Sequence, residues 1–310
     1  MIQRIRTDSK EEWLALRRKH IGGTDAAAIV GLNAFSSPFA VWAEKTGQVP
    51  EFEGNLRTEV GTYLEDFVAG KFEEATGKAA RRCRLSLVND AYPFAIANVD
   101  RLIVGEDAGL EIKTASALNM KAFRGGEYPD SYYVQCVHYL AVTGRAKWYL
   151  AVLIGNSEFK FFEIGRDEAE IAALMEAEKN FRDRYVIPRI PPPVDGSAAT
   201  TAAIKQIFGE PDGERVDLSG LEDVFAQRKL LSGQIKQLKE QIDGLDNQIK
   251  LQLGNAAGGS CGNWSVSWRL QGTAGLDRER FRAEHPEIDL GSYATQARVF
   301  RVTEKKTKQD

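Results

Sequence analysis

The sequence lacks any apolar run long enough to cross a membrane, because every hydrophobic stretch is interrupted well before about 18 residues. Its first residues lead into charged positions rather than an apolar segment, so a secretory signal is not expected. It has only three cysteines, and Cys83, Cys136 and Cys261 are far apart and form no C-x-x-C motif. These absences exclude a disulfide framework and a four-cysteine metal cluster within one chain, and they favour a reducing cytoplasm.

A charge excess of one sign is also absent, since 41 basic residues face 44 acidic ones for a net charge of −3. This balance excludes a generally basic nucleic-acid coat, but it leaves room for a local basic patch. One such run, free of acidic residues, contains Lys78, Arg81, Arg82 and Arg84. It is either solvated surface or a DNA-binding strip. The phosphate-binding pattern G-x-x-x-x-G-K-[ST] is missing as well, so no ATP-driven motor is encoded.

The residues that are present predict an α/β (α+β) protein, because helical and alternating apolar periods follow one another along the chain. Prolines cluster before residues 195–196 and indicate a boundary between a domain of residues 1–195 and an accessory region of residues 196–310. Helices are expected at about 9–20, 24–31, 37–47, 56–76, 130–143 and 166–185, and strands at about 82–89, 94–104, 109–114, 146–154 and 158–164.

The accessory region carries a heptad pattern on a predicted helix of about residues 218–253. Gly233 and Gly244 weaken that helix. Strands are expected at about 262–271 and 297–303, around a short helix. An isolated helix cannot bury its own apolar stripe, so the seam must pack against its own chain, another subunit or a partner protein. The seam residues are Leu231, Ile235, Leu238, Ile242, Leu245 and Ile249.

Two acidic residues and a lysine on neighbouring strands suggest a metal site. Glu111 and Lys113 share one strand face, and a hairpin can bring Asp100 beside Glu111. Adjacent carboxylates repel unless a proton or a cation relieves the repulsion, and carboxylate oxygens suit Mg²⁺ or Mn²⁺. Asp100 and Glu111, with the carbonyl of Ile112, are therefore expected to bind one Mg²⁺. Glu65, which borders the apolar stripe of its helix, would help to hold that ion or a second one. Lys113 would position a water and help to deprotonate it. A plain cross-strand salt bridge is the alternative.

Five motifs in a fixed order resemble the phage lambda exonuclease and YqaJ-type viral recombinase family, within the PD-(D/E)xK nuclease superfamily. The resemblance spans roughly residues 12–195. The motifs are Trp13, Arg17, Ile21, Gly22, Gly23, Thr24 and Asp25 in the opening block; Gly61 to Glu65; Ala97 to Asp100; Leu110 to Thr114; and Gln135 with Val142, Thr143 and Gly144.

The resemblance assigns roles to several residues. Arg17 and Thr24 would hold a DNA 5′ phosphate, and the spacing from Trp13 favours Arg17 over its neighbour Arg18. Glu65 matches the active-site glutamate, and Gln135 would complete the site. Two departures flank Asp100: Asn98-Val99 stands in place of Ser-Pro, and Arg101 in place of glycine. Both put the local backbone geometry in doubt without removing the aspartate.

The resemblance also implies a restriction-endonuclease-like core, with a mixed central sheet flanked by helices. It implies a Mg²⁺-dependent, phage- or prophage-encoded exonuclease in a bacterial cytoplasm, using one or two ions. Such an enzyme digests one strand of linear duplex DNA from 5′ to 3′ and leaves 3′ overhangs for strand annealing. The implied partners are double-stranded DNA ends, a single-strand-annealing recombinase and further copies of the chain in a toroidal trimer.

Two alternatives stay open. One is an endonuclease or junction-resolving nuclease with the same catalytic core. A pocket for a terminal phosphate at Arg17 and Thr24 would distinguish the exonuclease from this endonuclease, because only an enzyme that binds DNA ends needs such a pocket. The other is a noncatalytic DNA-binding or assembly protein that keeps the fold. The presence of all three residues Asp100, Glu111 and Lys113 argues against a noncatalytic protein.

Overall fold

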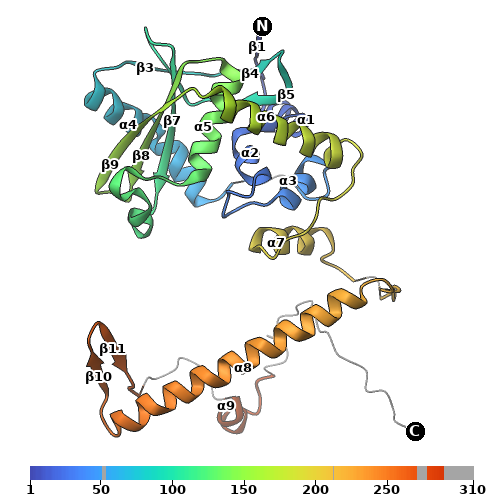
Figure 1. Cartoon of the computed structure of the whole chain (residues 1–310), viewed down its shortest axis with the longest axis vertical. Coiled ribbons are helices and arrows are strands. Elements are labelled where there is room, and N and C mark those ends of the chain that lie inside the picture. The colour runs from blue at the N-terminus through green and yellow to red at the C-terminus, as the bar shows by residue number, and fades with distance from the viewer. Residues whose placement is uncertain (51–53, 212, 271–277, 290–310) are drawn as a thin grey trace. The chain divides into compact units, whose positions relative to one another are not determined.

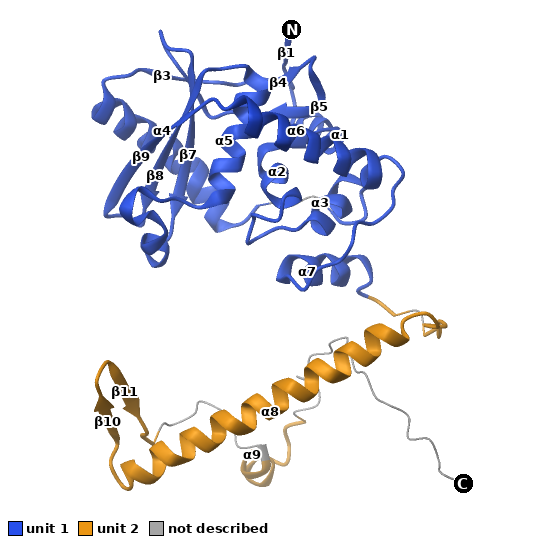
Figure 2. Cartoon of the chain, in the orientation of Figure 1, with its two compact units in different colours: residues 1–209 blue, residues 210–310 orange. Residues whose placement is uncertain are grey.

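The structure is a computed structural model of the chain, and it describes residues 1–50, 54–211, 213–270 and 278–289. Two compact units follow one another, Met1–Gly209 and Glu210–Asp310 (Figure 2). Each is described by itself. Among the described helices, none is both long and apolar enough to span a membrane.

The first unit alternates helices and strands along the chain, as the sequence periodicity predicts (Figure 1). Its elements are β1 (Ile2–Ile5), α1 (Lys10–Lys19), β2 (Ile21–Gly22), α2 (Gly23–Ile29), α3 (Pro38–Lys45), α4 (Leu56–Thr76), β3 (Ala80–Arg82), β4 (Ser86–Asn89), β5 (Tyr92–Ala97), β6 (Arg101–Ile103), β7 (Ala108–Ala115), the 3-10 segment η1 (Ala117–Gly126), α5 (Asp130–Thr143), β8 (Lys147–Ile154), β9 (Glu158–Gly165), α6 (Glu168–Phe181), the π-helical segment η2 (Arg182–Val186) and α7 (Ala198–Ile207).

A five-stranded mixed sheet with the order β3-β6-β7-β8-β9 forms the centre of this unit. Strands β7 and β8 run parallel, and the other neighbours are antiparallel. Helix α4 covers one face, where Val68 and Phe72 pack with Leu110. Helix α5 covers the other face, where Leu140 packs with Trp148. The mixed sheet flanked by helices confirms the fold class predicted from the sequence.

Two predicted strands are each divided between two sheets, which corrects the sequence reading. The strand expected at residues 82–89 is split into β3 and β4, and the one expected at 94–104 into β5 and β6. Strands β4 and β5 belong to a four-stranded sheet of order β1-β4-β5-β2, whereas β3 and β6 belong to the five-stranded sheet. Apolar periodicity shows which residues form strands but not which sheet each strand joins, and bends at Leu85 and Asp100 divide the two predicted strands. The change between β5 and β6 contains Asp100.

The first unit continues beyond the predicted boundary at residues 195–196. Helix α7 follows that boundary, and the hydroxyl of its Thr200 is hydrogen-bonded to the hydroxyl of Ser37 at 2.8 Å. Thr200 is 1% exposed and Ala203 is 5% exposed. The proline-rich segment therefore leads into one more helix of the same unit, and the division between units falls after Gly209.

The second unit contains the long helix α8 (Glu222–Leu253), the hairpin β10 (Gly258–Cys261) and β11 (Trp264–Ser267), and the short helix α9 (Arg278–Glu284). Helix α8 confirms the predicted long helix, which begins at Glu222 rather than near residue 218. Within the predicted strand at residues 262–271, Trp264–Ser267 form β11, which is the second strand of a hairpin with β10, and Gly262 lies in the turn between them. The strand predicted at residues 297–303 lies outside the described residues.

Candidate active site

The E-x-K strand presents its two charged side chains to one face of the five-stranded sheet. Glu111 and Lys113 are alternate residues of β7, and the neighbouring Ile112 packs with the α4 side. Asp100, at the change of sheet, reaches the same strand: its Oδ2 accepts a hydrogen bond from the backbone N–H of Ile112 at 2.8 Å. The structure thus brings Asp100 to the E-x-K strand, as predicted.

Gln135 of helix α5 joins the glutamate and the lysine. Its Nε2 donates to Glu111 Oε1 at 2.7 Å, and its Oε1 accepts from Lys113 Nζ at 2.8 Å. Lys113 Nζ also lies 2.7 Å from Glu111 Oε1. The ring of three contacts fixes one oxygen of Glu111 and leaves the rotamers of all three side chains little freedom. Gln135 Nε2 additionally donates to the hydroxyl of Tyr139 at 2.9 Å.

The electrostatics of this cluster show an excess of negative charge. Burial, and then the neighbouring Glu111 carboxylate, raise the pKa of Asp100 well above its ordinary value. Burial opposes the charge on Lys113, but Glu111 and Asp100 outweigh it, so the pKa of this lysine is raised. In this cluster the protonated form of Lys113 is therefore favoured, so its ammonium can donate hydrogen bonds.

The donor atoms of this cluster fit a hard divalent cation. Glu111 Oε2 is buried and has no hydrogen-bond partner, which is a costly arrangement for a carboxylate oxygen. With an oxygen of Asp100 and the carbonyl of Ile112, it makes an all-oxygen set of the kind that Mg²⁺ and Mn²⁺ take. In the described part of the chain, no group of three or more His, Cys, Asp or Glu side chains could hold a metal. Such a cation would thus depend on two carboxylates, a main-chain oxygen and water.

Glu65 comes from helix α4 and is engaged with a residue that the sequence reading did not include in the site. Its Oε1 pairs with Arg101 Nη1, and Arg101 Nη2 lies 2.5 Å from Asp66 Oδ1. Arg101 is only 3% exposed and also donates to the carbonyl of Asp100 at 3.0 Å. The sequence marked Arg101 only as a departure from glycine. Glu65 lies close enough to Asp100 to contribute to its raised pKa.

The opening motif lies against the same cluster. Trp13 Nε1 donates to the side chain of Asn98 at 3.2 Å, and the Arg17 guanidinium lies 4.9 Å from the centre of the Trp13 ring. Thr24 is exposed in the first turn of α2. A Cβ on the preceding Gly23 would lie only 2.8 Å from Gln135 Cγ, so glycine permits the close approach of α2 to α5.

A buried ion pair connects the segments that carry Arg17 and Thr24. Lys45 Nζ lies 2.6 Å from Asp25 Oδ2 and donates to the carbonyl of Arg17 at 2.9 Å. Asp25 Oδ2 also accepts the backbone N–H of Gly22 at 2.8 Å. Lys45 therefore ties the last turn of α1 to the first turn of α2. The sequence reading missed this link, since only the acid of the pair belongs to a recognised motif.

The basic run divides into two kinds of residue. Lys78 forms an ion pair with Glu106 at 2.6 Å, on the rim of the sheet. Arg81, Arg82 and Arg84 are exposed, and Arg82 pairs with Asp66 at 2.8 Å. Arg82 and Arg84 line a surface hollow together with Trp13, Glu65, Asn98 and Asp100, among others. The structure thus brings part of this run to the acidic cluster and leaves Lys78 in a surface ion pair.

His138, which shares a helix face with Gln135 in sequence, belongs to the core. It is 0% exposed, its Nδ1 lies 2.8 Å from Glu178 Oε1, and its Nε2 lies 3.0 Å from the carbonyl of Ile96. It is a satisfied structural residue.

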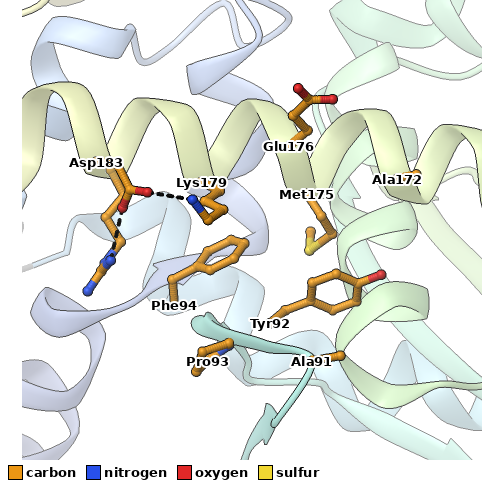
Figure 3. A pocket seen from close by; sticks show the side chains of 10 residues that line it. Ala91, Tyr92, Pro93, Phe94, Ala172, Met175, Glu176, Lys179 and Asp183 are labelled. Carbon is orange, nitrogen blue, oxygen red and sulfur yellow. Dashed lines mark hydrogen bonds and ion pairs between the residues drawn. The ribbon is translucent and has the colours of Figure 1, made fainter.

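A separate hollow lies between β5 and α6 and contains none of the predicted site residues (Figure 3). Met175, Phe94 and Tyr92 line this hollow, and the Lys179–Asp183 ion pair lies at its border.

Comparison with known proteins agrees with this arrangement. Residues 12–146 match the family described as the YqaJ-like viral recombinase domain. The chain is 40% identical over 285 residues to the protein YqaJ of Bacillus subtilis (strain 168), covering 90% of this chain and 89% of that protein.

Among solved structures, the chain resembles an alkaline exonuclease from Laribacter hongkongensis, with a TM-score of 0.50 and 19% identity over 58% of this chain and 94% of that one. The same exonuclease in complex with dAMP gives a TM-score of 0.50 and 20% identity. This likeness is one of fold. By its sequence, the chain belongs to the YqaJ-like viral recombinase family.

Proposed function

We propose that the chain is a Mg²⁺-dependent exonuclease that digests one strand of linear duplex DNA from 5′ to 3′. The observation that carries this proposal is the cluster of Asp100, Glu111, Lys113 and Gln135, in which a buried carboxylate oxygen of Glu111 has no partner. The similar solved structure from Laribacter hongkongensis is named an alkaline exonuclease, which supports the hydrolysis of DNA as the reaction class. Mn²⁺ is expected to replace Mg²⁺.

The reaction is hydrolysis of a phosphodiester, in which a water oxygen bonds to phosphorus as the bond to the leaving oxygen breaks. A divalent cation, when bound, lowers the pKa of that water and stabilises the charge on the phosphoryl group. Asp100 and Glu111 would hold the cation, with the carbonyl of Ile112. Glu65 would contribute only after exchanging its contact with Arg101.

Lys113 orients the reacting groups. Its ammonium has three donors, and two of them are directed to Glu111 and Gln135. The third is available for the attacking water or a phosphate oxygen, where its positive charge stabilises the negative charge that develops. Gln135 fixes the rotamers of both Glu111 and Lys113, so it is a positioning residue.

The polarity of digestion follows, in this proposal, from Arg17 and Thr24. A guanidinium binds a terminal phosphate through two hydrogen bonds, and a threonine hydroxyl can add a third. Trp13 contacts both Arg17 and Asn98, and the Lys45 ion pair ties the segment of Arg17 to that of Thr24, which supports a shared phosphate site. A 5′ phosphate bound there would set the scissile bond at the cation. Double-stranded DNA ends are thus the proposed substrate, with an annealing recombinase and a toroidal trimer as the proposed partners.

The test uses linear duplex DNA with a 5′ phosphate or a 5′ hydroxyl, and a closed circle, each with Mg²⁺ or EDTA. We expect release of nucleotides from linear DNA with Mg²⁺ and not with EDTA, faster from the phosphorylated ends than from the hydroxyl ends, and no cleavage of the closed circle. Asp100→Asn and Glu111→Gln should abolish release, while the exposed Glu176→Gln serves as a matched control. Cleavage of the circle would identify an endonuclease instead. Binding without cleavage in any arm would identify a noncatalytic DNA-binding protein.

The end preference is tested separately from the chemistry. Arg17→Ala should remove the preference for 5′-phosphorylated ends while Mg²⁺-dependent cleavage persists at a lower rate. Arg18→Ala is the matched control from the adjacent position. Equal rates on phosphorylated and hydroxyl ends in the unaltered chain would contradict the proposed phosphate site.

A further inference from the structure

Helix α8 of the second unit carries an apolar seam that is open to solvent in the described part of the chain. The helix is 32 residues long, and none of its residues is buried. Six seam residues follow one another at alternating spacings of four and three. Their exposed fractions are 50% for Leu231, 66% for Ile235, 58% for Leu238, 57% for Ile242, 59% for Leu245 and 43% for Ile249.

The identity of the seam residues indicates what covers them. In heptad terms every a position from 235 to 249 is isoleucine and every d position from 231 to 245 is leucine. Isoleucine at a with leucine at d favours two parallel strands over three or four, because a β-branched side chain packs well at a and a γ-branched one at d. Gly233 and Gly244 fall at f and c, outside the seam, so they do not interrupt its packing.

The charges beside the seam allow the same arrangement. In a parallel pair each g residue faces the e residue of the next heptad on the partner helix. The g positions are all glutamine, namely Gln234, Gln241 and Gln248, and two of the facing e positions are Lys239 and Asp246. No like charges therefore meet across a symmetric parallel pair.

The chain's own hairpin reaches only the end of the seam. Ile249 and Leu253 of α8 line a hollow with Trp264 and Val266 of the hairpin. A Cβ on Gly259 would lie 3.1 Å from Leu253 Cδ2, so β10 is in close contact with the last turn of the helix. The seam from Leu231 to Leu245 lies before this contact.

We propose that residues 231–249 of α8 pair with the same residues of a second copy of this chain, in a parallel two-stranded coiled coil. This contact goes beyond the proposed nuclease function, and it needs none of the catalytic residues. Because the isoleucine and leucine pattern favours two strands, it is a contact different from that of a three-fold ring of nuclease units. It would join two nuclease units through their C-terminal regions.

A cysteine placed on the seam tests both the pairing and its direction in the full-length chain. The background is Cys261→Ser, because Cys261 is exposed. In a parallel pair, position 235 lies beside position 235 of the partner. In an antiparallel pair centred on the seam it would lie about 15 Å away along the helix axis, too far for a disulfide. Lys236→Cys, one position further and outside the seam, is the matched control.

Under mild oxidation, Ile235→Cys should form a covalent dimer at least about 10-fold faster than Lys236→Cys. Leu238→Asp should lower the particle mass measured by analytical ultracentrifugation about two-fold, whereas Leu251→Asp, on the outer face, should leave it unchanged. The helix content of each variant is checked by circular dichroism. The catalytically inactive Glu111→Gln chain should dimerise like the unaltered one, so a failure of the nuclease proposal would not affect this result.

Equal crosslinking of the two cysteine variants would overturn the proposal. It would mean that the seam is covered by the chain itself or by a different protein. Crosslinking between Ile235→Cys and Leu245→Cys chains, without crosslinking of Ile235→Cys alone, would overturn the parallel arrangement in favour of an antiparallel one.

Discussion

Arg101 pairs with Glu65 directly beside the aspartate of the candidate active site. The guanidinium is 3% exposed, so a fixed positive charge is buried next to a carboxylate that the family resemblance assigns to catalysis. Asp66 and the carbonyl of Asp100 accept the remaining hydrogen bonds that the structure shows for this arginine. In the proposed site, Arg101 and a metal ion would thus compete for the Glu65 carboxylate.

This competition predicts the effect of Arg101→Met, which keeps an apolar stem and removes the charge. Mg²⁺ affinity, measured by calorimetry without DNA, should rise several-fold because Glu65 becomes available as a ligand. The free energy of unfolding should fall by about 1–3 kcal/mol, since the hydrogen bonds of a buried charged group are lost. Adding Glu65→Gln to this variant should return the affinity to that of the unaltered chain. Unchanged affinity in Arg101→Met would show that Glu65 is not a ligand.

The contacts of Gln135 predict a loss of rate without a loss of binding. Gln135→Met removes the hydrogen bonds that orient Glu111 and Lys113, but it removes no metal ligand. Residues that orient ligands typically contribute about 10–100-fold, so kcat should fall by that factor while the Kd for DNA stays within about two-fold. Gln227→Met, on an exposed part of α8, is the matched control. A parallel loss of kcat and of DNA affinity would mean that Gln135 contacts the DNA itself.

The sequence predicted the catalytic cluster well because short-range rules determine most of it. Strand alternation places Glu111 and Lys113 on one face, and a hairpin returns Asp100 to them; both expectations agree with the structure. The place of Gln135 in the site was predicted from the family resemblance. Helical periodicity alone does not predict which strand the side chain of a helix residue contacts.

The features of the site that the sequence did not predict depend on contacts between segments that are far apart in the chain. Arg101 meets Glu65 across 36 positions, and Lys45 meets Asp25 across the loop between two helices. Neither ion pair can be predicted from the local periodicity of the sequence. The change of sheet at Asp100 was also hidden, because the strands on the two sides of the bend at this residue show the same alternation of side chains. Gly23, the first residue of α2, carried a signal in retrospect, because glycine is used where a neighbouring element approaches the backbone closely.

The Asp25–Lys45 ion pair predicts a specific acid sensitivity. Burial opposes the charge on Asp25, but Lys45 and Arg17 outweigh it, and the pKa of this carboxyl is lowered in the folded chain. A lowered folded pKa means that the stabilisation is present above the unfolded pKa of about 4, and it is lost as pH falls through the lower folded value. The free energy of unfolding should therefore fall more steeply below pH 4 in the unaltered chain than in Asp25→Asn. Parallel curves for the two proteins would contradict this.

Breaking the same pair from the other side should cost more. Lys45→Met leaves Asp25 buried without its partner, which typically destabilises a protein by about 3–5 kcal/mol. Thermal unfolding measures this directly. Because Lys45 also holds the carbonyl of Arg17, the preference for 5′-phosphorylated ends should decrease in any fraction that remains folded.

The division within the basic run predicts different salt effects for its members. Arg84 is exposed beside the acidic cluster, so Arg84→Ala should weaken DNA binding and reduce the slope of log affinity against log salt by about 1. Lys78 is paired with Glu106, so Lys78→Ala should change that slope much less. Titrations at several salt concentrations give both slopes. Equal slopes for the two variants and the unaltered chain would show that the basic run is solvent-exposed surface that does not bind DNA.

The position of α7 predicts where the chain can be shortened. A chain that ends at Asp195 loses Thr200 and Ala203, both of which are buried in the first unit, so it should unfold at a lower temperature than the full chain. A chain that ends at Gly209 keeps these contacts. It should melt cooperatively and retain Mg²⁺-dependent cleavage of short duplexes, because every candidate catalytic residue precedes Gly209.

If α8 joins two copies, this shorter chain should also lose that association and digest long duplexes less processively. A chain of residues 1–209 that folds, as shown by circular dichroism, but does not cleave would mean that the second unit forms part of the DNA path.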